Sequence, residues 1–389
     1  MSANLEQFVE LTAHDGGEGV VWLDSSGCSA GEREPVSRMF WAPVEILQGS
    51  VFSDGDRERL RRVLAGLPQA SGALAGAVDY DGSFTFGVYP EHQVGPSLEA
   101  SHEEAPQEAS GPPMHPEMTR DSFCGAVSAA KEYIAAGDIY QVNIAQRFSG
   151  PGIGRDEAVA LYRRLRVLSP VPRGAFVSLN GRQLLSASPE TFIDVRDGKV
   201  TTRPIKGTRP RCTGAVEDAR SIAELQGSAK ERSELVMITD LERNDLGRVC
   251  EFGSVEVSDL IELESFEHVH HLVSTVRGDL LPEKDALDVL AECSPGGSIT
   301  GAPKRRAMEI IEELEPCQRG AYTGSIGYLG ADGSASFNIA IRTIVATADE
   351  MSFHVGSGIV ADSDPVAEYE ETLHKGKGMA LALGLDWEV

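Results

Sequence analysis

Residues 173–203 read RGAFVSLNGRQLLSASPETFIDVRDGKVTTR. The dipeptides Asn180-Gly181 and Asp197-Gly198 interrupt the apolar runs of this stretch, and both tolerate the positive φ of a two-residue hairpin turn. The stretch therefore predicts antiparallel strands joined by tight turns. Because hairpins of this kind outnumber strand–helix–strand units along the chain, the sequence predicts an α+β fold with mainly antiparallel sheets rather than a Rossmann fold.

Helices and further strands are predicted on both sides of this stretch. One helix is expected to begin after Thr119 or Asp121 and to run through Ala136, because Gly137 ends its apolar periodicity. Other helices are predicted near 56–67, 228–244, 304–315 and 365–383, and other strands near 140–148, 255–278 and 321–358. Within 336–345 apolar and polar residues alternate strictly, which predicts one continuous strand with Arg342 on its polar face.

The chain has 389 residues, of which 41% are apolar, enough to bury a sizeable core. We expect one large domain with an appended portion, or two fused halves, because single cores rarely grow beyond ~300 residues. Residues 91–117 are rich in proline and acidic residues, which predicts a linker or long loop. This divides the chain into an N-terminal portion, 1–90, that packs on a catalytic core, 118–389.

The formal charge of −25 argues against nucleic-acid binding, which needs a basic surface. The first residues lack the features of a signal peptide, and no apolar run is long enough to span a membrane. The 6 cysteines form no CxxC pair, so neither a zinc site nor a disulfide framework is predicted. A cytoplasmic location is the expectation.

Two predicted helices carry carboxylates that could be functional. Glu234 shares a helical seam with Ile238 and Leu241, so it is either a helix-edge residue that reaches water or a metal ligand. The last predicted helix begins at Pro365 with an apolar stripe of Val366, Tyr369, Leu373, Met379, Ala380, Ala382 and Leu383. Its charged face holds Glu368, Glu371 and Lys375, and the pattern leaves open whether that face is solvated or covered.

Three other segments could hold reactive or ligand-binding groups. The glycine-rich loop 295–304 can present backbone N–H groups to an anion, but it lacks the Gly-Lys-Ser/Thr of a Walker A loop. His268, His270 and His271 are a weak metal signal, and one of them is expected to face a pocket. Lys206 lies between an isoleucine and a glycine, where a desolvated amine can act as a nucleophile or base.

Seven ordered blocks within 120–383 resemble the chorismate-utilising enzymes: PIKGTRPR, SASPETF, SELVMITDLERNDLGRV, HLVSTVRG, PGGSITGAPKRRAMEIIEELE, FNIAIRT and GSGIVADSDPVAEYEETLHKGKGM. This family includes anthranilate synthases, isochorismate and salicylate synthases and component I of the aminodeoxychorismate synthases. The resemblance implies a four-layer α/β/β/α fold with two large packed sheets. Lys206 stands where anthranilate synthases have alanine (PIAGT), which makes the chain resemble the aminodeoxychorismate synthases (PIKGT).

The resemblance also implies roles for individual residues. Lys206 would be the nucleophile that attacks ring carbon 2 of chorismate, Glu190 the general acid for the leaving 4-hydroxyl, and His271 the active-site histidine. Glu234 and Glu371 would ligate Mg²⁺, with Glu368 in its outer sphere or bound through water. The implied substrate contacts are Gly207, Thr208, Gly297, Ser298, Tyr322, Arg342, Gly356, Gly358 and Lys375.

The implied activity is the conversion of chorismate and ammonia to 4-amino-4-deoxychorismate, for p-aminobenzoate and folate or for secondary metabolism. A separate glutamine amidotransferase subunit is expected to supply ammonia, because the chain lacks a Gly-x-Cys-x-Gly nucleophile segment. The Leu-Leu-Glu-Ser element of tryptophan-regulated anthranilate synthases is absent, so tryptophan inhibition is not expected. The alternatives are an anthranilate, salicylate or isochorismate synthase, or a catalytically idle subunit.

Overall fold

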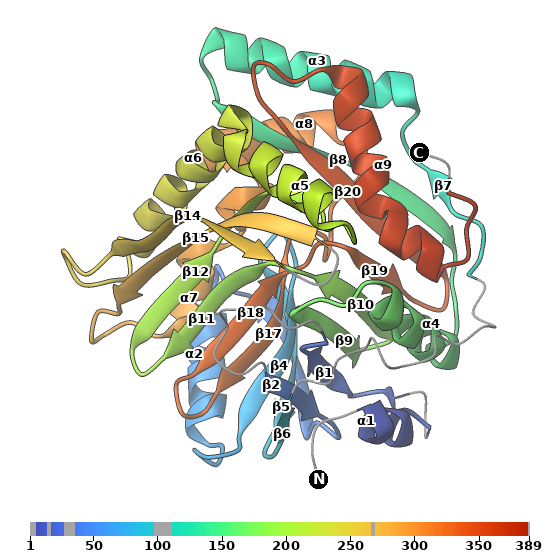
Figure 1. Ribbon diagram of the computed structural model, residues 1–389. Helices are drawn as coiled ribbons and strands as arrows, with labels where there is room; N and C mark the ends of the chain where they lie inside the picture. The colour runs from blue at the N-terminus through green and yellow to red at the C-terminus, as the bar shows by residue number, and fades with distance from the viewer. Residues whose placement is uncertain (1–4, 14–16, 27–35, 97–110, 266–268, 388–389) are drawn as a thin grey trace.

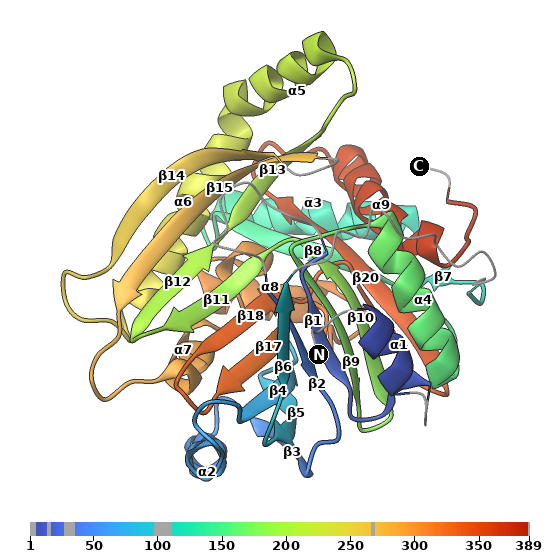
Figure 2. The same cartoon turned by 60° about the horizontal axis from the view of Figure 1, so that its bottom comes forward.

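The computed structural model describes residues 5–13, 17–26, 36–96, 111–265 and 269–387. Two large sheets pack face to face, and helices cover the outer face of each (Figure 1, Figure 2). All pairings between the described strands are antiparallel. The predicted α+β class, with its α/β/β/α layers, is confirmed.

The first sheet has the strand order β16-β8-β20-β19-β10-β9-β1-β2-β6, with β7 paired to β8. Its strands are β1 (Val21–Asp24), β2 (Val36–Phe40), β6 (Gln93–Pro96), β7 (His115–Pro116), β8 (Gln141–Pro151), β9 (Arg173–Leu179), β10 (Arg182–Ser188), β16 (Gly301–Ala302), β19 (Thr343–Ala346) and β20 (Glu350–Ile359).

The second sheet has the order β13-β15-β12-β11-β18-β17-β4-β5-β3, with β14 paired to β15. Its strands are β3 (Glu45–Ser50), β4 (Ala73–Val78), β5 (Ser83–Tyr89), β11 (Thr191–Arg196), β12 (Lys199–Arg203), β13 (Ile205–Pro210), β14 (Glu256–Ser265), β15 (Val269–Asp279), β17 (Ser325–Gly330) and β18 (Ala335–Ile339). Strands that precede residue 97 therefore belong to both sheets.

The described helices divide between the two outer layers. They are α1 (Leu5–Thr12), α2 (Asp54–Ala65), α3 (Arg120–Ala136), α4 (Arg155–Leu168), α5 (Ala215–Gly227), α6 (Ala229–Leu246), α7 (Ala286–Cys293), α8 (Lys304–Leu314) and α9 (Pro365–Ala382). Helices α1, α3, α4, α8 and α9 pack on the first sheet, and α2, α6 and α7 pack on the second.

Apolar side chains fill the spaces between these layers. Ala75 and Tyr328 of the second sheet meet Val177 of the first in the core between the sheets. Phe337 packs with residues of α2 and α7, and Phe353 packs with residues of α4 and α9. Burial of one large apolar side chain contributes about 1.5–3 kcal/mol to the stability of the fold. These three cores therefore hold the two sheets in place, and with them the polar residues that the sheets carry.

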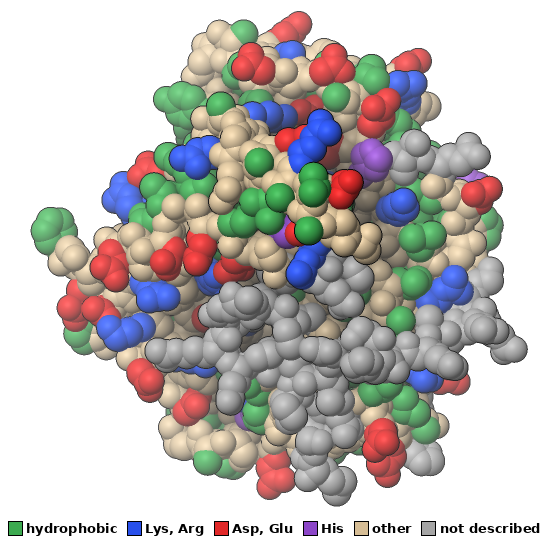
Figure 3. All heavy atoms as spheres, in the orientation of Figure 1, with side chains coloured by type: hydrophobic (Ala, Val, Ile, Leu, Met, Phe, Trp, Pro, Cys, Tyr) green, Lys and Arg blue, Asp and Glu red, His purple; other side chains and the backbone are tan. Residues whose placement is uncertain are grey.

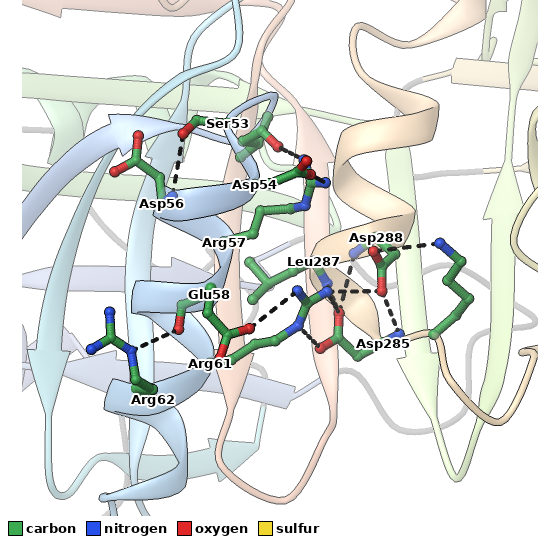
Figure 4. Close-up of polar contacts among 12 residues, drawn as sticks. Ser53, Asp54, Asp56, Arg57, Glu58, Arg61, Arg62, Asp285, Leu287 and Asp288 are labelled. Carbon is green, nitrogen blue, oxygen red and sulfur yellow. Dashed lines mark hydrogen bonds and ion pairs between the residues drawn. The ribbon is translucent and has the colours of Figure 1, made fainter.

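A polar cluster ties α2 to α7 at one edge of the second sheet (Figure 4). The Arg61 guanidinium donates to Asp285 from Nε at 2.7 Å and to Asp288 at 2.9 Å. The Asp285 carboxylate also caps α7 by accepting the Leu287 and Asp288 backbone N–H groups. One arginine thus fixes a helix cap on an element far away in the sequence.

Several local predictions are confirmed. Thr119 caps α3, and Gly137 ends it with a left-handed φ of 84°. Asn180 and Asp197 have φ values of 54° and 51°, as hairpin turns of this type require. The helices and strands that were predicted near 56–67, 140–148, 228–244, 304–315 and 365–383 are all present within a few residues of those bounds.

The prediction of one strand over 336–345 is wrong. Strand β18 ends at Ile339 in the second sheet, and β19 begins at Thr343 in the first. Between them the chain crosses from one sheet to the other, and Arg342 has a left-handed φ of 50°. The sequence pattern cannot show this crossing, because apolar and polar residues alternate in the same way before and after it. Arg342 therefore lies on a crossover and not in mid-strand.

One residue of the predicted apolar stripe on the last helix is also placed differently. Val366 is 41% exposed, while Glu368, on the predicted charged face, is only 3% exposed. The first turn of α9 thus buries Glu368, whereas Glu371 and Lys375 keep 47% and 41% of their side chains exposed. The predicted charged face is therefore covered at Glu368 and open at the other two residues.

Candidate active site

A cavity of about 690 Å³ collects most of the predicted site residues. It is lined by Glu190, Lys206, Gly207, Thr208, Glu234, His271, Ser298, Tyr322, Arg342, Gly356, Gly358, Glu371 and Lys375. Gly297 and Glu368 are not among its lining residues. Side chains from both sheets, from α6 and from α9 therefore meet in one place, although they are far apart in the sequence.

Two crossovers between the sheets form one wall of the cavity. Glu190 lies where the chain passes from β10 to β11, and Arg342 lies where it passes from β18 to β19. The two crossovers are joined by backbone hydrogen bonds, from Ile339 N to Glu190 O and from Ala187 N to Arg342 O. This places a carboxyl group and a guanidinium together at the point where the two sheets exchange strands.

Lys206 reaches the cavity from β13. This strand pairs with β15, and a bulge at Gly207 separates the Lys206–Leu272 and Thr208–His271 pairs. Gly207 has a φ of 73°, and a Cβ there would lie 2.8 Å from Leu225, so the bulge requires glycine. The Lys206 Nζ donates to the Ser298 carbonyl at 3.0 Å. The half-buried amine is therefore oriented by the loop that precedes α8.

Glu190 is almost fully enclosed, with 5% exposure. Burial raises the pKa of its carboxyl, while the nearby Ser298 hydroxyl, Lys206 and Arg342 act in the opposite direction. The net shift is upward, so Glu190 keeps a proton to higher pH than an ordinary glutamate. A carboxyl in this state can act as a general acid.

His271 is a neutral imidazole at physiological pH. Burial lowers its pKa to about 4, and the Arg342 charge acts in the same direction. Its Nδ1 lies 2.9 Å from the Thr208 hydroxyl and 3.3 Å from the Gly207 carbonyl. Because a carbonyl only accepts, Nδ1 carries the proton in the contact with Gly207. Of the three predicted histidines, His270 pairs with Asp218, and His268 lies outside the described residues.

Tyr322 and Gly356 form the part of the wall next to β20. A Cβ at Gly356 would lie 2.7 Å from the Tyr322 hydroxyl and 2.6 Å from Asn143 Oδ1. Glycine is thus needed for both polar groups to approach the strand. The Tyr322 ring stacks on His354 with centroids 5.0 Å apart, which fixes its orientation.

Glu234 and Glu371 approach the cavity from two helices, α6 and α9. Burial raises the pKa of Glu234, and Lys206 and Lys230 oppose that shift. Burial would also raise the pKa of Glu371, but Lys375, whose Nζ lies 2.6 Å from Glu371 Oε1, outweighs this and lowers it. The Glu371 carboxyl therefore ionises more readily than an ordinary glutamate. At Glu234 the charges of the two lysines do not outweigh the effect of burial, and its pKa stays raised.

The two predicted residues outside the cavity lie behind its wall. Glu368 accepts hydrogen bonds from Ser357 and from Ser363, the latter at 2.6 Å, and from Lys230. Gly297 faces Leu241 of α6, where a Cβ would come within 2.7 Å of the leucine side chain. Both residues therefore act on the cavity only through their neighbours.

The carboxylates fit a divalent cation that also takes ligands from water and substrate. Glu234 Oε1 is buried and accepts no hydrogen bond from the described residues. Within the same residues, no group of three or more His, Cys, Asp and Glu side chains forms a metal site. Mg²⁺ commonly uses one or two carboxylates and completes its octahedron with water and substrate oxygens. Glu234 and Glu371 are the pair that suits this mode of binding.

Sequence reasoning missed several polar residues that line the same cavity, among them Lys230, Asn143 and His354. Lys230 stands one helical turn before Glu234, a spacing that could have revealed it. Asn143 and His354 lie on strands in which neither alternation nor composition distinguishes a cavity residue from an ordinary buried one. A larger cavity, of about 850 Å³, contains none of the predicted site residues.

On the described part of the face in Figure 3, acidic and basic side chains are interspersed. None of the helices in the described ranges is both long and apolar enough to cross a membrane.

Comparison with known proteins identifies the family. Residues 82–381 match the family of chorismate binding enzymes. The chain belongs to this family. The predicted resemblance is thereby confirmed for more than half of the chain, and the residues that line the cavity fall within the matched part, from Asn143 to Met379.

Relatives with different names are similar to this chorismate-binding enzyme. It is 49% identical over 267 residues to anthranilate synthase component 1 of Streptomyces coelicolor, covering 68% of this chain and 52% of that protein. It is 48% identical over 258 residues to aminodeoxychorismate synthase component 1 of Escherichia coli, covering 66% and 56%. The chain thus spans little more than half the length of these relatives.

A solved structure supports the fold over nearly the whole chain. Anthranilate synthase component I from Streptococcus pneumoniae superposes with a TM-score of 0.75 and 31% identity, covering 90% of this chain and 93% of the other. The relatives therefore establish an enzyme family that acts on chorismate, while their names divide between two amination products.

Proposed function

We propose that the chain is component I of an aminodeoxychorismate synthase, which converts chorismate and ammonia to 4-amino-4-deoxychorismate and water. The observation that carries this proposal is the position of Lys206. Its amine lies in the cavity, 3.0 Å from the Ser298 carbonyl and near the carboxyl groups of Glu190 and Glu234. A lysine at this place can become a nucleophile during the reaction.

The cavity offers complementary charge to a dianionic substrate. Arg342 and Tyr322 would receive the enolpyruvyl carboxylate, because a guanidinium and a hydroxyl are strong donors to carboxylate oxygens. Lys375 and the 297–298 loop would lie nearer the ring carboxylate. Mg²⁺, held by Glu234 and Glu371, would supply positive charge to that carboxylate when bound. These positive charges offset the electrostatic repulsion between the dianion and a chain whose net charge is −25.

The chemistry proceeds in two displacements. The Lys206 nitrogen, as the uncharged amine, forms a bond to ring carbon 2 with its electron pair, the double bond shifts, and the bond between carbon 4 and its hydroxyl breaks. Glu190 gives its proton to that hydroxyl, which leaves as water. Ammonia then bonds to carbon 4, the electrons shift back, and the lysine is expelled from carbon 2. The nitrogen now bound to carbon 4 carries a positive charge and returns one proton to the Glu190 carboxylate.

An anthranilate synthase is the second candidate, because a relative with that name is 49% identical over 267 residues. In that reaction ammonia itself attacks carbon 2, so no protein nucleophile is needed there. Lys206 occupies carbon 2 in the proposed mechanism and leaves only carbon 4 open to ammonia. This is why the presence of lysine at this position favours the aminodeoxychorismate product.

Ammonia would be supplied by a separate glutamine amidotransferase subunit in the cytoplasm. The product would serve p-aminobenzoate and folate synthesis, or a pathway of secondary metabolism. These assignments rest on the family resemblance and on the aminodeoxychorismate synthase relatives, which are named as component 1.

The test is product analysis with the purified chain, chorismate, Mg²⁺ and an ammonium salt at alkaline pH. We expect 4-amino-4-deoxychorismate with ammonium and no product with glutamine alone. Lys206→Ala should lose most of this product and release some anthranilate, while Lys377→Ala, an exposed lysine on α9, should behave as the wild type. Anthranilate as the main wild-type product would instead establish the second candidate.

A further inference from the structure

Among the described residues, Lys230 is the lysine whose amine lies within 4.0 Å both of a carboxylate that lines the cavity, Glu234, and of one behind its wall, Glu368. It lies in the first turn of α6, and its side chain is 48% exposed. The Nζ is 3.3 Å from Glu368 Oε1 and 4.0 Å from Glu234 Oε1. A single ammonium that lines the cavity therefore bridges α6 and α9.

The carboxylates around Lys230 are unequally satisfied. Glu368 has two serine donors in addition to the lysine, and Glu371 has the close Lys375 contact. Glu234 has no hydrogen-bond donor at its buried Oε1 among the described residues, and only the charges of Lys206 and Lys230 oppose the effect of its burial. Lys230 is thus the nearby positive charge on its own helix that compensates Glu234.

We propose that Lys230 is an internal counter-ion of the carboxylate site and competes with a divalent cation for it. The inference rests on the proposed function, which assigns Glu234 and Glu371 to the metal. An ammonium and a divalent cation repel each other strongly when they share one carboxylate, so the lysine must leave as the metal enters. Its half-exposed, four-carbon side chain can turn outward into water.

This arrangement has a consequence for affinity. Displacement of Lys230 from Glu234 and Glu368 subtracts from the free energy of metal binding, so the wild type binds a bare cation weakly. A substrate carboxylate that enters with the metal adds a ligand and shifts the balance. The lysine therefore favours occupation of the site by metal and substrate together over occupation by metal alone.

The test is Mn²⁺ binding without chorismate, followed by the electron paramagnetic resonance signal of free Mn²⁺. Lys230→Met removes the charge and keeps an unbranched side chain, so we expect at least about tenfold tighter binding than in the wild type. Lys377→Met, a lysine that is exposed on α9, is the matched control and should not change the affinity. Equal or weaker binding by Lys230→Met would overturn the proposal.

A second readout follows the metal-free protein. In the presence of a chelator, Lys230→Met should unfold at a lower temperature than the wild type, because Glu234 and Glu368 lose their counter-ion. Added Mn²⁺ should reverse the loss, and Lys230→Arg should resemble the wild type in both measurements. If Glu234→Gln does not weaken Mn²⁺ binding to the wild type, the metal assignment itself fails. Equal affinities of wild type and Lys230→Met at a Glu234-dependent site refute only the role of the lysine.

Discussion

The half-exposed Glu371 of the cavity differs from the buried Glu190 and Glu242, although all three lie close to cationic side chains. Glu371 lies beside Lys375 and its pKa is lowered. Away from solvent, burial raises the pKa of Glu190, which lines the cavity, and of Glu242, which does not line it, the latter to about 8. The same side chain is thus a fixed charge in one region and a proton carrier in the other. Solvent access and the distance to a cation decide which role is available.

Glu190→Gln is expected to have the largest effect on turnover, because it removes the acid while keeping the shape of the side chain. The value of kcat should fall by about 10²–10⁴-fold, the usual contribution of a general acid. Chorismate binding should persist, since Arg342 and Lys375 are untouched. Steady-state kinetics and calorimetric titration with chorismate measure the two quantities separately.

The pH profile sharpens the same prediction. Glu190 must be protonated to act, and burial shifts its pKa upward, so kcat at saturating free ammonia should decline as pH rises through that raised pKa. His271, with a pKa of about 4, should contribute no step near neutral pH. A rate that climbs steadily with pH after correction for free ammonia would remove Glu190 from the role of acid.

Glu242→Gln should change stability in a manner that depends on pH. The buried Glu242 carboxyl accepts a hydrogen bond from Thr202 at 2.6 Å, and its pKa is about 8, against 4.5 for an ordinary glutamate. As pH rises above about 4.5 the unfolded chain loses this proton first, so the wild type loses stability up to about pH 8.

Glutamine does not titrate and can still accept from Thr202. The variant should therefore gain stability over the wild type from about pH 5 upward, levelling off above pH 8 at roughly 2–5 kcal/mol. Urea unfolding at a series of pH values provides the measurement. A difference that is constant with pH would mean that Glu242 ionises as readily in the folded protein as in the unfolded one.

The smallest effect is expected far from the cavity, at the α2–α7 cluster. Arg61→Ala removes the contacts to Asp285 and Asp288 and should lower the free energy of unfolding by about 1–2 kcal/mol. Turnover per folded molecule should stay at the wild-type level. Arg62→Ala, an exposed neighbour on the same helix, serves as the control in denaturant titration. A loss of activity in Arg61→Ala at full folding would show that α7 transmits strain to the active site.

The sequence was sufficient where a local signal determines local geometry. Asn180-Gly181 favoured a primed turn, and Thr119 offered a helix cap. The sequence blocks that resemble the family also named most of the predicted residues that the structure places in the cavity.

The remaining features depend on contacts between distant segments. The crossover at Arg342 follows from the meeting of two sheets, and alternation looks the same on either side of it. The burial of Glu368 requires Ser357 and Ser363 to meet it from β20 and from the loop before α9. The charge balance at Glu234 depends more on Lys206 of β13 than on Lys230, and no helical spacing relates Lys206 to α6.

The most direct test of the central claim is the mass of the protein after incubation with chorismate and Mg²⁺ without ammonia. In the proposed mechanism Lys206 is the nucleophile, and without ammonia its adduct cannot be released by amination. We predict a mass increase equal to chorismate less one water, located by peptide mapping at Lys206 and absent from Lys206→Ala. An unmodified wild type under these conditions, together with Lys206→Ala forming aminodeoxychorismate at the wild-type rate, would contradict the account and reduce the lysine to a charge in the pocket.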